Sequence, residues 1–210
     1  GASGGGPHAH HAQSCPVIAY GRDGATCSAD VVVPDLDAAL ALEQRVQGWP
    51  MAALVLVQVL RSTERLPPAQ ALDLESMAYA TLQAGAEFAA WRQGCAHDAL
   101  AAPVPEAGEP LLLERRGALI EAVLNRPGTR NAMSVEMRDA WIEALQLLEA
   151  DESVTELRFR ALGACFSVGG ELREFGSTPD PATAHWVRTV HSQARLLERL
   201  GSRVSCYLHG

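Results

Sequence analysis

The part of the chain after Pro110 alternates between strand-like and helix-like segments, and this order restricts the possible folds. "VTELRFRAL" places Leu157, Phe159 and Ala161 on one side with polar or charged residues between them, which is the period of a half-buried strand. "LLLERRGALIEAVL" (111–124) predicts two strands joined by a turn at Arg116-Gly117. Because helical patterns separate the later strands, those strands need crossover connections. We therefore expect an α/β fold with the order β-β-α-β-α-β, in which "RVSCYLHG" is the last strand.

Two helices are predicted between these strands. Ser134 can cap a helix that continues through Ala150, with Glu136 in its positive first turn. Asp180-Pro181 can open a second helix that Gly201 closes. The apolar faces of the two helices are predicted to consist of Trp141, Ala144, Leu145 and Leu148 in the first, and of Trp186, Val190 and Leu197 in the second.

The region before Pro110 has a different residue pattern, which predicts a separate module. Residues 30–94 carry repeated helical patterns, so we expect a small helical module there, with one short strand at "DVVVPD" at its start. Residues 95–110 are rich in Ala and Pro and are expected to be a linker, and residues 1–29 are expected to be a disordered tail. We interpret the three histidines of that tail as part of it rather than as a metal site.

Composition narrows the function classes. A formal net charge of −8 argues against a nucleic-acid or anionic-membrane partner. Five widely spaced cysteines are typical of a reducing compartment, and the longest apolar run, "MAALVLVQVL", is too short to span a bilayer. We expect a cytoplasmic protein with no cofactor or metal of its own.

The segment "CFSVGGELREF" (165–175) is the first candidate site. It begins as a strand end and finishes as the first turn of a helix, with Gly169 and Gly170 between. An amide at such a step can donate to a carbonyl oxygen that becomes an oxyanion, and glycine lets the carbonyl approach closely. A tight turn with no ligand is the alternative interpretation of a diglycine on its own.

The diglycine is the middle one of three motifs that follow one another along the chain. "LNRP…NA" in 124–132, "FSVGG" in 166–170 and a strand ending in "HG" closely resemble the crotonase superfamily, the enoyl-CoA hydratase/isomerase family. The resemblance covers 111–210 and corresponds to the N-terminal part of that family's core. It implies a ββα spiral that binds acyl-CoA thioesters and stabilises an enolate.

The resemblance also implies residue roles. Gly170 would supply the first oxyanion-hole amide, and Val168, Gly169, Glu171, Leu172 and Arg173 would line the thioester and pantetheine end of the substrate. Arg130 and Ala132 would face the nucleotide end of CoA. Guanidinium groups pair well with phosphate, so Arg126, Arg130 and Arg173 are chemically suited to CoA phosphates, and a solvated loop charge is the alternative for Arg126. Tyr207 and His209 lie near the expected site, whereas His191 is expected at the surface.

In that family the second oxyanion amide and the catalytic acids follow the "HG", whereas this sequence ends at Gly210. We expect hydratase or isomerase chemistry of the family, with coenzyme A entering as part of the substrate and a homo-oligomer as the assembly. Two alternatives stay open: a cofactor-independent arylacetyl-CoA oxygenase, since some relatives with a helical extension have that activity, and a non-catalytic module for CoA binding or oligomerisation.

Overall fold

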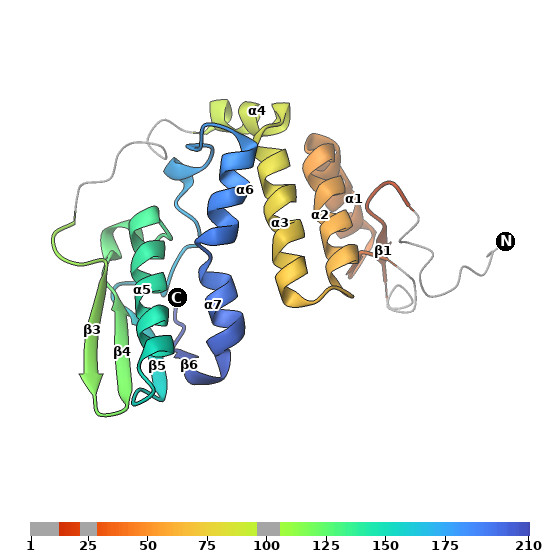
Figure 1. Cartoon of the computed structure of the whole chain (residues 1–210). Coiled ribbons are helices and arrows are strands. Elements are labelled where there is room, and N and C mark those ends of the chain that lie inside the picture. The colour runs from red at the N-terminus through yellow and green to blue at the C-terminus, as the bar shows by residue number, and fades with distance from the viewer. Residues whose placement is uncertain (1–12, 22–28, 96–105) are drawn as a thin grey trace. The chain divides into compact units, whose positions relative to one another are not determined.

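The computed structural model describes residues 13–21, 29–95 and 106–210, which divide into two compact units, Gly1–Arg92 and Gln93–Gly210 (Figure 1). Each unit is described by itself. Among the described residues, no helix is both long and apolar enough to cross a membrane. The four cysteines in those ranges are all free thiols. The histidine cluster of the N-terminus lies outside them.

The first unit holds four helices and a small parallel sheet. The helices are α1 (Leu36–Gly48), α2 (Pro50–Thr63), α3 (Pro68–Gln83) and α4 (Ala86–Gly94), and the strands are β1 (Ile18–Tyr20) and β2 (Val31–Val33). Pro50 and Pro68 occupy first turns, where the missing amide hydrogen costs nothing. Glu87 of α4 caps α2, because its carboxylate accepts from Met51 N at 2.8 Å and from Ala52 N at 2.9 Å.

Strand β1 corrects the expectation that residues 1–29 are disordered throughout. It pairs with β2, and the cause lies far along the chain in Arg61, which is 8% exposed. The Arg61 guanidinium binds the carboxylate of Asp30 at 2.6 Å and the carbonyls of Gln13 and Cys15 at 2.7 and 3.0 Å. Asp30 in turn accepts from Val17 N at 2.7 Å. A buried ion pair therefore fixes this segment.

The second unit is the mixed helix and sheet fold that the sequence predicts. Its sheet has the order β3-β4-β5-β6, formed by β3 (Leu111–Arg116), β4 (Leu119–Leu124), β5 (Glu156–Ala161) and β6 (Val204–Cys206). The first two strands form an antiparallel hairpin, and the other two pairs are parallel, as the crossover helices require. Helix α5 (Val135–Ala150) follows β4, and α6 (Pro181–Val190) and α7 (Gln193–Leu200) follow β5 (Figure 1).

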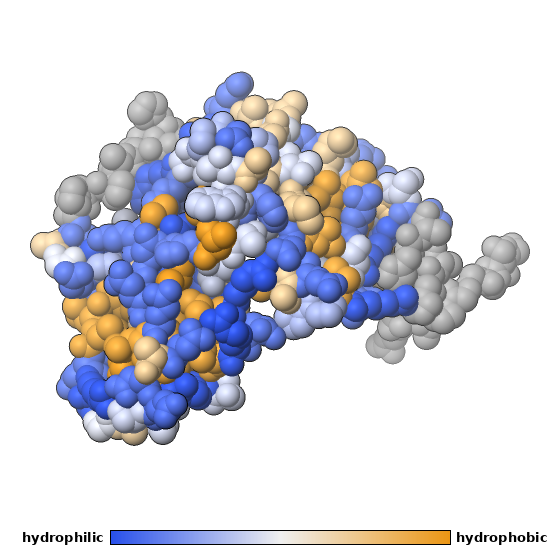
Figure 2. All heavy atoms as spheres, in the orientation of Figure 1, coloured by the Kyte–Doolittle hydropathy of each residue, from blue (hydrophilic) through white to orange (hydrophobic). Residues whose placement is uncertain are grey.

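The core lies between one face of this sheet and α5. Trp141 of α5 stacks on Phe159 of β5, with ring centroids 3.9 Å apart and planes inclined by 10°. All four residues predicted for the apolar face of α5 are buried, and the Ser134 hydroxyl caps the helix by accepting from Met137 N at 3.2 Å. The edge strand β3 reaches past this core and leaves Leu112 and Leu113 exposed. Figure 2 shows apolar surface where β3, β4 and α5 lie in Figure 1.

The single helix predicted from residue 180 to 201 is wrong, because the structure breaks it in two. Asp180 caps α6, which ends at Val190, and the Ser192 hydroxyl caps α7 by accepting from Arg195 N at 3.4 Å. His191 between them has the non-helical angles φ −125° and ψ 65°. Trp186 within α6 is 63% exposed, so the predicted apolar face is not buried along its whole length.

We predict that Asp30→Asn destabilises the protein by about 3–5 kcal/mol, since it leaves the buried Arg61 charge without its anion. Urea denaturation measures the free energy of unfolding, with Asp37→Asn as the control because Asp37 is an exposed carboxylate on α1. A loss of no more than about 1 kcal/mol, the typical size for point substitutions, would contradict the role given to this pair.

Candidate functional site

The candidate site lies where β4 and β5 end. The two strands are parallel neighbours, with Ala122 opposite Phe159 and Leu124 opposite Ala161, so they end at the same edge of the sheet. The segments that follow them, 125–134 and 162–174, consequently run together. In open sheets with parallel strands this edge is where ligands commonly bind.

Asn131 joins the two segments from a fully buried position. Its side-chain oxygen accepts from Arg126 N at 2.9 Å, and its side-chain nitrogen donates to the carbonyls of Leu162 at 2.8 Å and Cys165 at 3.1 Å. Its backbone carbonyl accepts from the Ser167 hydroxyl at 2.7 Å. The side chain thus uses both of its amide hydrogens and its oxygen, which is the condition for burying an amide at little cost.

The second link is a parallel bridge between Met133 and Gly170. Met133 N donates to Gly169 O at 2.7 Å, and Met133 O accepts from Glu171 N at 3.3 Å. Both bonds go to the neighbours of Gly170. The Gly169 carbonyl and the Gly170 N–H belong to one trans peptide and point in opposite directions, so the N–H of Gly170 points away from Met133.

The amide of Gly170 is therefore available to a ligand. Gly170 is exposed, and its N–H donates no hydrogen bond to any residue in the described ranges. Gly169 beside it has φ +90°, a conformation in which a side chain would be strained. At Gly170 itself a Cβ would stand 2.8 Å from the Phe175 ring, so the ring closes one side of the residue. Glycine is therefore favoured at 169 because of the backbone angle and at 170 because of the limited space beside Phe175.

The helix expected directly after the diglycine is a single 3₁₀ turn, Leu172–Glu174. Phe175 is extended and Gly176 has φ +72°, so the backbone leaves helical geometry at once. A helix dipole behind the Gly170 amide is consequently not a feature of the site. What prepares this amide as a donor is its orientation by the bridge and its lack of a partner within the described structure.

Glu171 and Arg173 bind each other within this turn. Arg173 Nε donates to the Glu171 carboxylate at 2.6 Å, and the same carboxylate caps the turn by accepting from Arg173 N at 3.1 Å. The side-chain hydrogen bond from Arg173 lowers the pKa of the Glu171 carboxyl below its usual value. The charge of the Arg173 guanidinium, which was predicted to face the substrate, is thus balanced by the Glu171 carboxylate of the same turn. The apolar side chains of Val168 and Leu172 beside the site are exposed.

The three arginines considered for CoA phosphates have separate environments. Arg126 is buried, pairs with Glu136 at 2.8 Å and donates to the Gly108 carbonyl at 2.8 Å, so it is a structural residue and not a solvated loop charge. Arg173 pairs with Glu171. Arg130 is exposed, with φ +53°, and its side chain makes no hydrogen bond or ion pair within the described ranges. Of these three arginines, Arg130 is the one whose side chain is accessible to an anionic ligand.

The other predicted neighbours take structural positions. Ala132 is buried, so its side chain offers no ligand surface. His209 lies beside the site, where its carbonyl accepts from Phe166 N at 2.8 Å, while Tyr207 lies under the Arg160 guanidinium at 4.8 Å. His191 is 44% exposed and 3.2 Å from the Asp139 carboxylate, in agreement with its expected place at the surface.

Glu174 is a residue of the site that the sequence did not reveal. Its carboxylate accepts from Val135 N, the first amide of α5, at 2.8 Å. Burial raises the pKa of the Glu174 carboxyl above its usual value, and the hydrogen bond from Val135 opposes this. The two partners are 39 residues apart in the chain, so no local pattern could have indicated the contact.

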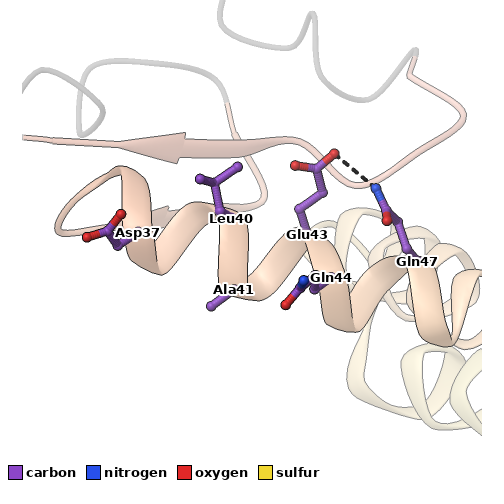
Figure 3. A pocket seen from close by; sticks show the side chains of 6 residues that line it. All are labelled: Asp37, Leu40, Ala41, Glu43, Gln44 and Gln47. Atoms are coloured by element: carbon purple, nitrogen blue, oxygen red, sulfur yellow. Dashed lines mark hydrogen bonds between the residues drawn. The ribbon is translucent and has the colours of Figure 1, made fainter.

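A depression in the first unit lies along α1 (Figure 3). All of its lining residues are exposed and belong to one helix: Asp37, Leu40, Ala41, Glu43, Gln44 and Gln47. Gln47 Nε2 donates to Glu43 Oε1 at 3.2 Å across it. The side chains of a single helix face cannot surround a ligand, so this depression is not a competing site. In the described ranges, no group of three or more His, Cys, Asp or Glu side chains could hold a metal ion.

Comparison with known proteins agrees with the motifs. No protein-family model matches the chain. The Bacillus subtilis protein YhaR, provisionally named an enoyl-CoA hydratase/isomerase, is 37% identical over 65 residues, which are 31% of this chain and 25% of that protein. The enoyl-CoA hydratase EchA19 of Mycobacterium tuberculosis is 31% identical over 74 residues, which are 35% and 28% of the two chains.

An enoyl-CoA hydratase of Mycobacterium smegmatis, a crystal structure, shares 30% identity over 49% of this chain and 41% of its own, with a TM-score of 0.43. The chain spans about a quarter of the length of the curated relatives it matches. All these relatives carry names of the enoyl-CoA hydratase/isomerase group, and the matches to structures cover about half of the chain. The two curated relatives confirm the resemblance to the crotonase superfamily predicted from the sequence, over about a third of the chain.

Glu171 and Glu174 are predicted to give stability opposite dependences on pH. The folded pKa of Glu171 is lowered, so its contribution to the free energy of unfolding is present above the unfolded pKa of about 4.3 and is lost as pH falls through the folded pKa. The folded pKa of Glu174 is raised, so the folded state holds that proton more tightly. Its contribution therefore decreases as pH rises from about 4.3 through the folded pKa.

The measurement is the difference in unfolding free energy between the parent and each of Glu171→Gln and Glu174→Gln, from about pH 3 to pH 7. Each variant serves as the control for the other, since the two residues share the same short turn. Slopes of the same sign for the two differences would refute the environments assigned to these carboxyls.

Proposed function

We propose that this chain, which is similar over about a third of its length to enoyl-CoA hydratases and isomerases, takes part in acyl-CoA chemistry by stabilising a thioester enolate. The thioester carbonyl oxygen accepts a hydrogen bond from Gly170 N. When a general base supplied by the buffer takes the α-proton, the electron pair of the broken C–H bond moves onto that oxygen, and the developing charge strengthens the hydrogen bond. Such a donor acts on the transition state more than on the ground state, which is the requirement for catalysis.

One observation carries the proposal, namely the exposed amide of Gly170, which has no hydrogen-bond partner among the residues that the structure describes. Buried amides are normally paired, whereas exposed ones can bind water and need no fixed orientation. This amide is instead oriented by the two hydrogen bonds of Met133 to the residues on either side of it. A fixed donor needs no reorganisation when negative charge forms, and that preorganisation is the source of its catalytic effect.

Arg130 supports the binding half of the proposal. Its exposed guanidinium follows β4, whereas the oxyanion donor follows β5, and the two segments are joined by the Val168 N to Arg130 O hydrogen bond of 3.2 Å. We assign Arg130 to a phosphate of CoA, since guanidinium groups pair well with phosphate oxygens. Arg126 and Arg173 are instead engaged in ion pairs with Glu136 and Glu171, so we assign them structural roles.

The test compares Gly170→Pro with Gly170→Ala. Both variants add a Cβ next to the Phe175 ring, but only proline removes the N–H. We expect the rate of thioester enolate formation to fall by about 10²–10³ in Gly170→Pro relative to Gly170→Ala, the usual effect of losing one oxyanion donor. Deuterium uptake at the α-carbon of butyryl-CoA in D₂O, followed by NMR, measures enolate formation without depending on the later reaction.

Circular dichroism must show that both variants are folded, because proline also restricts the backbone. Equal deuterium uptake in the two folded variants would reject Gly170 as the donor. Uptake by the parent protein that does not exceed that of buffer would reject the proposed enolate chemistry as a whole.

A further inference from the structure

Glu174 makes a contact across the site that the oxyanion donor alone does not explain. Its carboxylate accepts from Val135 N at 2.8 Å, at the first residue of α5. The first amides of a helix lack partners within the helix. Ser134 supplies the local cap to Met137 N, so the amide of Val135 is satisfied from the other segment of the site.

This contact and the Met133 bridge hold the same short turn at two places. Met133 binds on either side of Gly170, and Val135, two residues later, binds the side chain four residues after Gly170. The backbone between these anchors closes into the 3₁₀ turn, with Glu174 N donating to Glu171 O at 3.0 Å. The direction of the Gly170 N–H therefore depends on two anchors and not on the bridge alone.

The charges around Glu174 are largely engaged elsewhere. Arg173 pairs with Glu171, and Arg138 donates to Asp139 at 2.8 and 3.0 Å. Glu171, Arg138 and Arg173 are the charged groups that act on the Glu174 carboxyl, alongside its partial burial. Its hydrogen-bonding oxygen, rather than a salt bridge, is consequently the feature by which it joins the turn to α5.

We propose that Glu174 is a positioning residue that fixes the orientation of the Gly170 amide by anchoring its turn to the first amide of α5. The effect of Glu174 on acyl-CoA binding rests on the proposed function. Its effect on the hydrogen bonds between Met133 and the residues beside Gly170 does not. What matters is an acceptor oxygen at this place, so glutamine can replace glutamate and alanine cannot. A residue that merely stabilised α5 would not affect the hydrogen bonds beside Gly170.

The first experiment tests the mechanical link by amide hydrogen exchange in the parent, Glu174→Ala, Glu174→Gln and Glu143→Ala. Glu143 is an exposed glutamate on α5 and serves as the matched control. In Glu174→Ala we expect exchange of the Val135 and Glu171 amides to rise about fivefold or more, the effect of losing one hydrogen bond. Glu174→Gln and Glu143→Ala should exchange like the parent. An unchanged Glu171 amide in folded Glu174→Ala would overturn the proposal.

The second experiment tests recognition by calorimetric titration with acetoacetyl-CoA and with free CoA, which lacks a thioester carbonyl. We expect Glu174→Ala to weaken acetoacetyl-CoA binding about fivefold or more and to leave CoA binding unchanged, with rescue by Glu174→Gln. Equal weakening of both ligands would reject positioning of the carbonyl donor. If the parent binds neither ligand, the proposed function fails, and the exchange measurement still decides whether Glu174 positions the turn.

Discussion

The buried side-chain amide of Asn131 is the interaction on which the rest of the candidate site depends. It ties the segment after β4 to the segment after β5 through Arg126 N and the carbonyls of Leu162 and Cys165. No apolar side chain of similar size could do this, because one buried and two partly buried backbone groups would then lose their partner, at about 1–3 kcal/mol for the buried one. Asn131 also has φ +52°, a conformation that asparagine tolerates better than most residues.

Once the two segments are joined, the position of each functional group follows. The parallel bridge orients the Gly170 amide outward, Phe175 closes the space beside it, and Glu171 and Arg173 cancel each other's charge within the turn. The site that remains is a neutral, exposed donor with apolar neighbours, and the exposed cation Arg130 lies on the joined segment. This combination suits a ligand with an apolar thioester end and an anionic end, which is the chemistry of an acyl-CoA.

The sequence predicted the features that local patterns encode. The alternation around Leu157 and Phe159 gave the strand, the Ser134 cap gave the start of α5, and the diglycine gave the location of the candidate donor. It did not predict β1, the break at His191 or the contacts of Asn131 and Glu174. Strand β1 depends on Arg61, and the break at His191 depends on a local cap at Ser192. The contacts of Asn131 with Leu162 and Cys165, and of Glu174 with Val135, join residues 31, 34 and 39 positions apart. An asparagine in a Gly- and Arg-rich loop was the one available signal for Asn131.

The central claim is that the Gly170 amide donates to a thioester oxygen. The most direct measurement is the ¹H chemical shift of that amide in ¹⁵N-labelled protein, titrated with acetoacetyl-CoA and separately with CoA. A new hydrogen bond to an anionic or strongly polarised oxygen deshields the amide proton. We expect a downfield shift of the Gly170 amide with acetoacetyl-CoA that CoA does not produce. Saturating acetoacetyl-CoA that leaves this resonance unmoved, while other resonances of the loop shift, would contradict it.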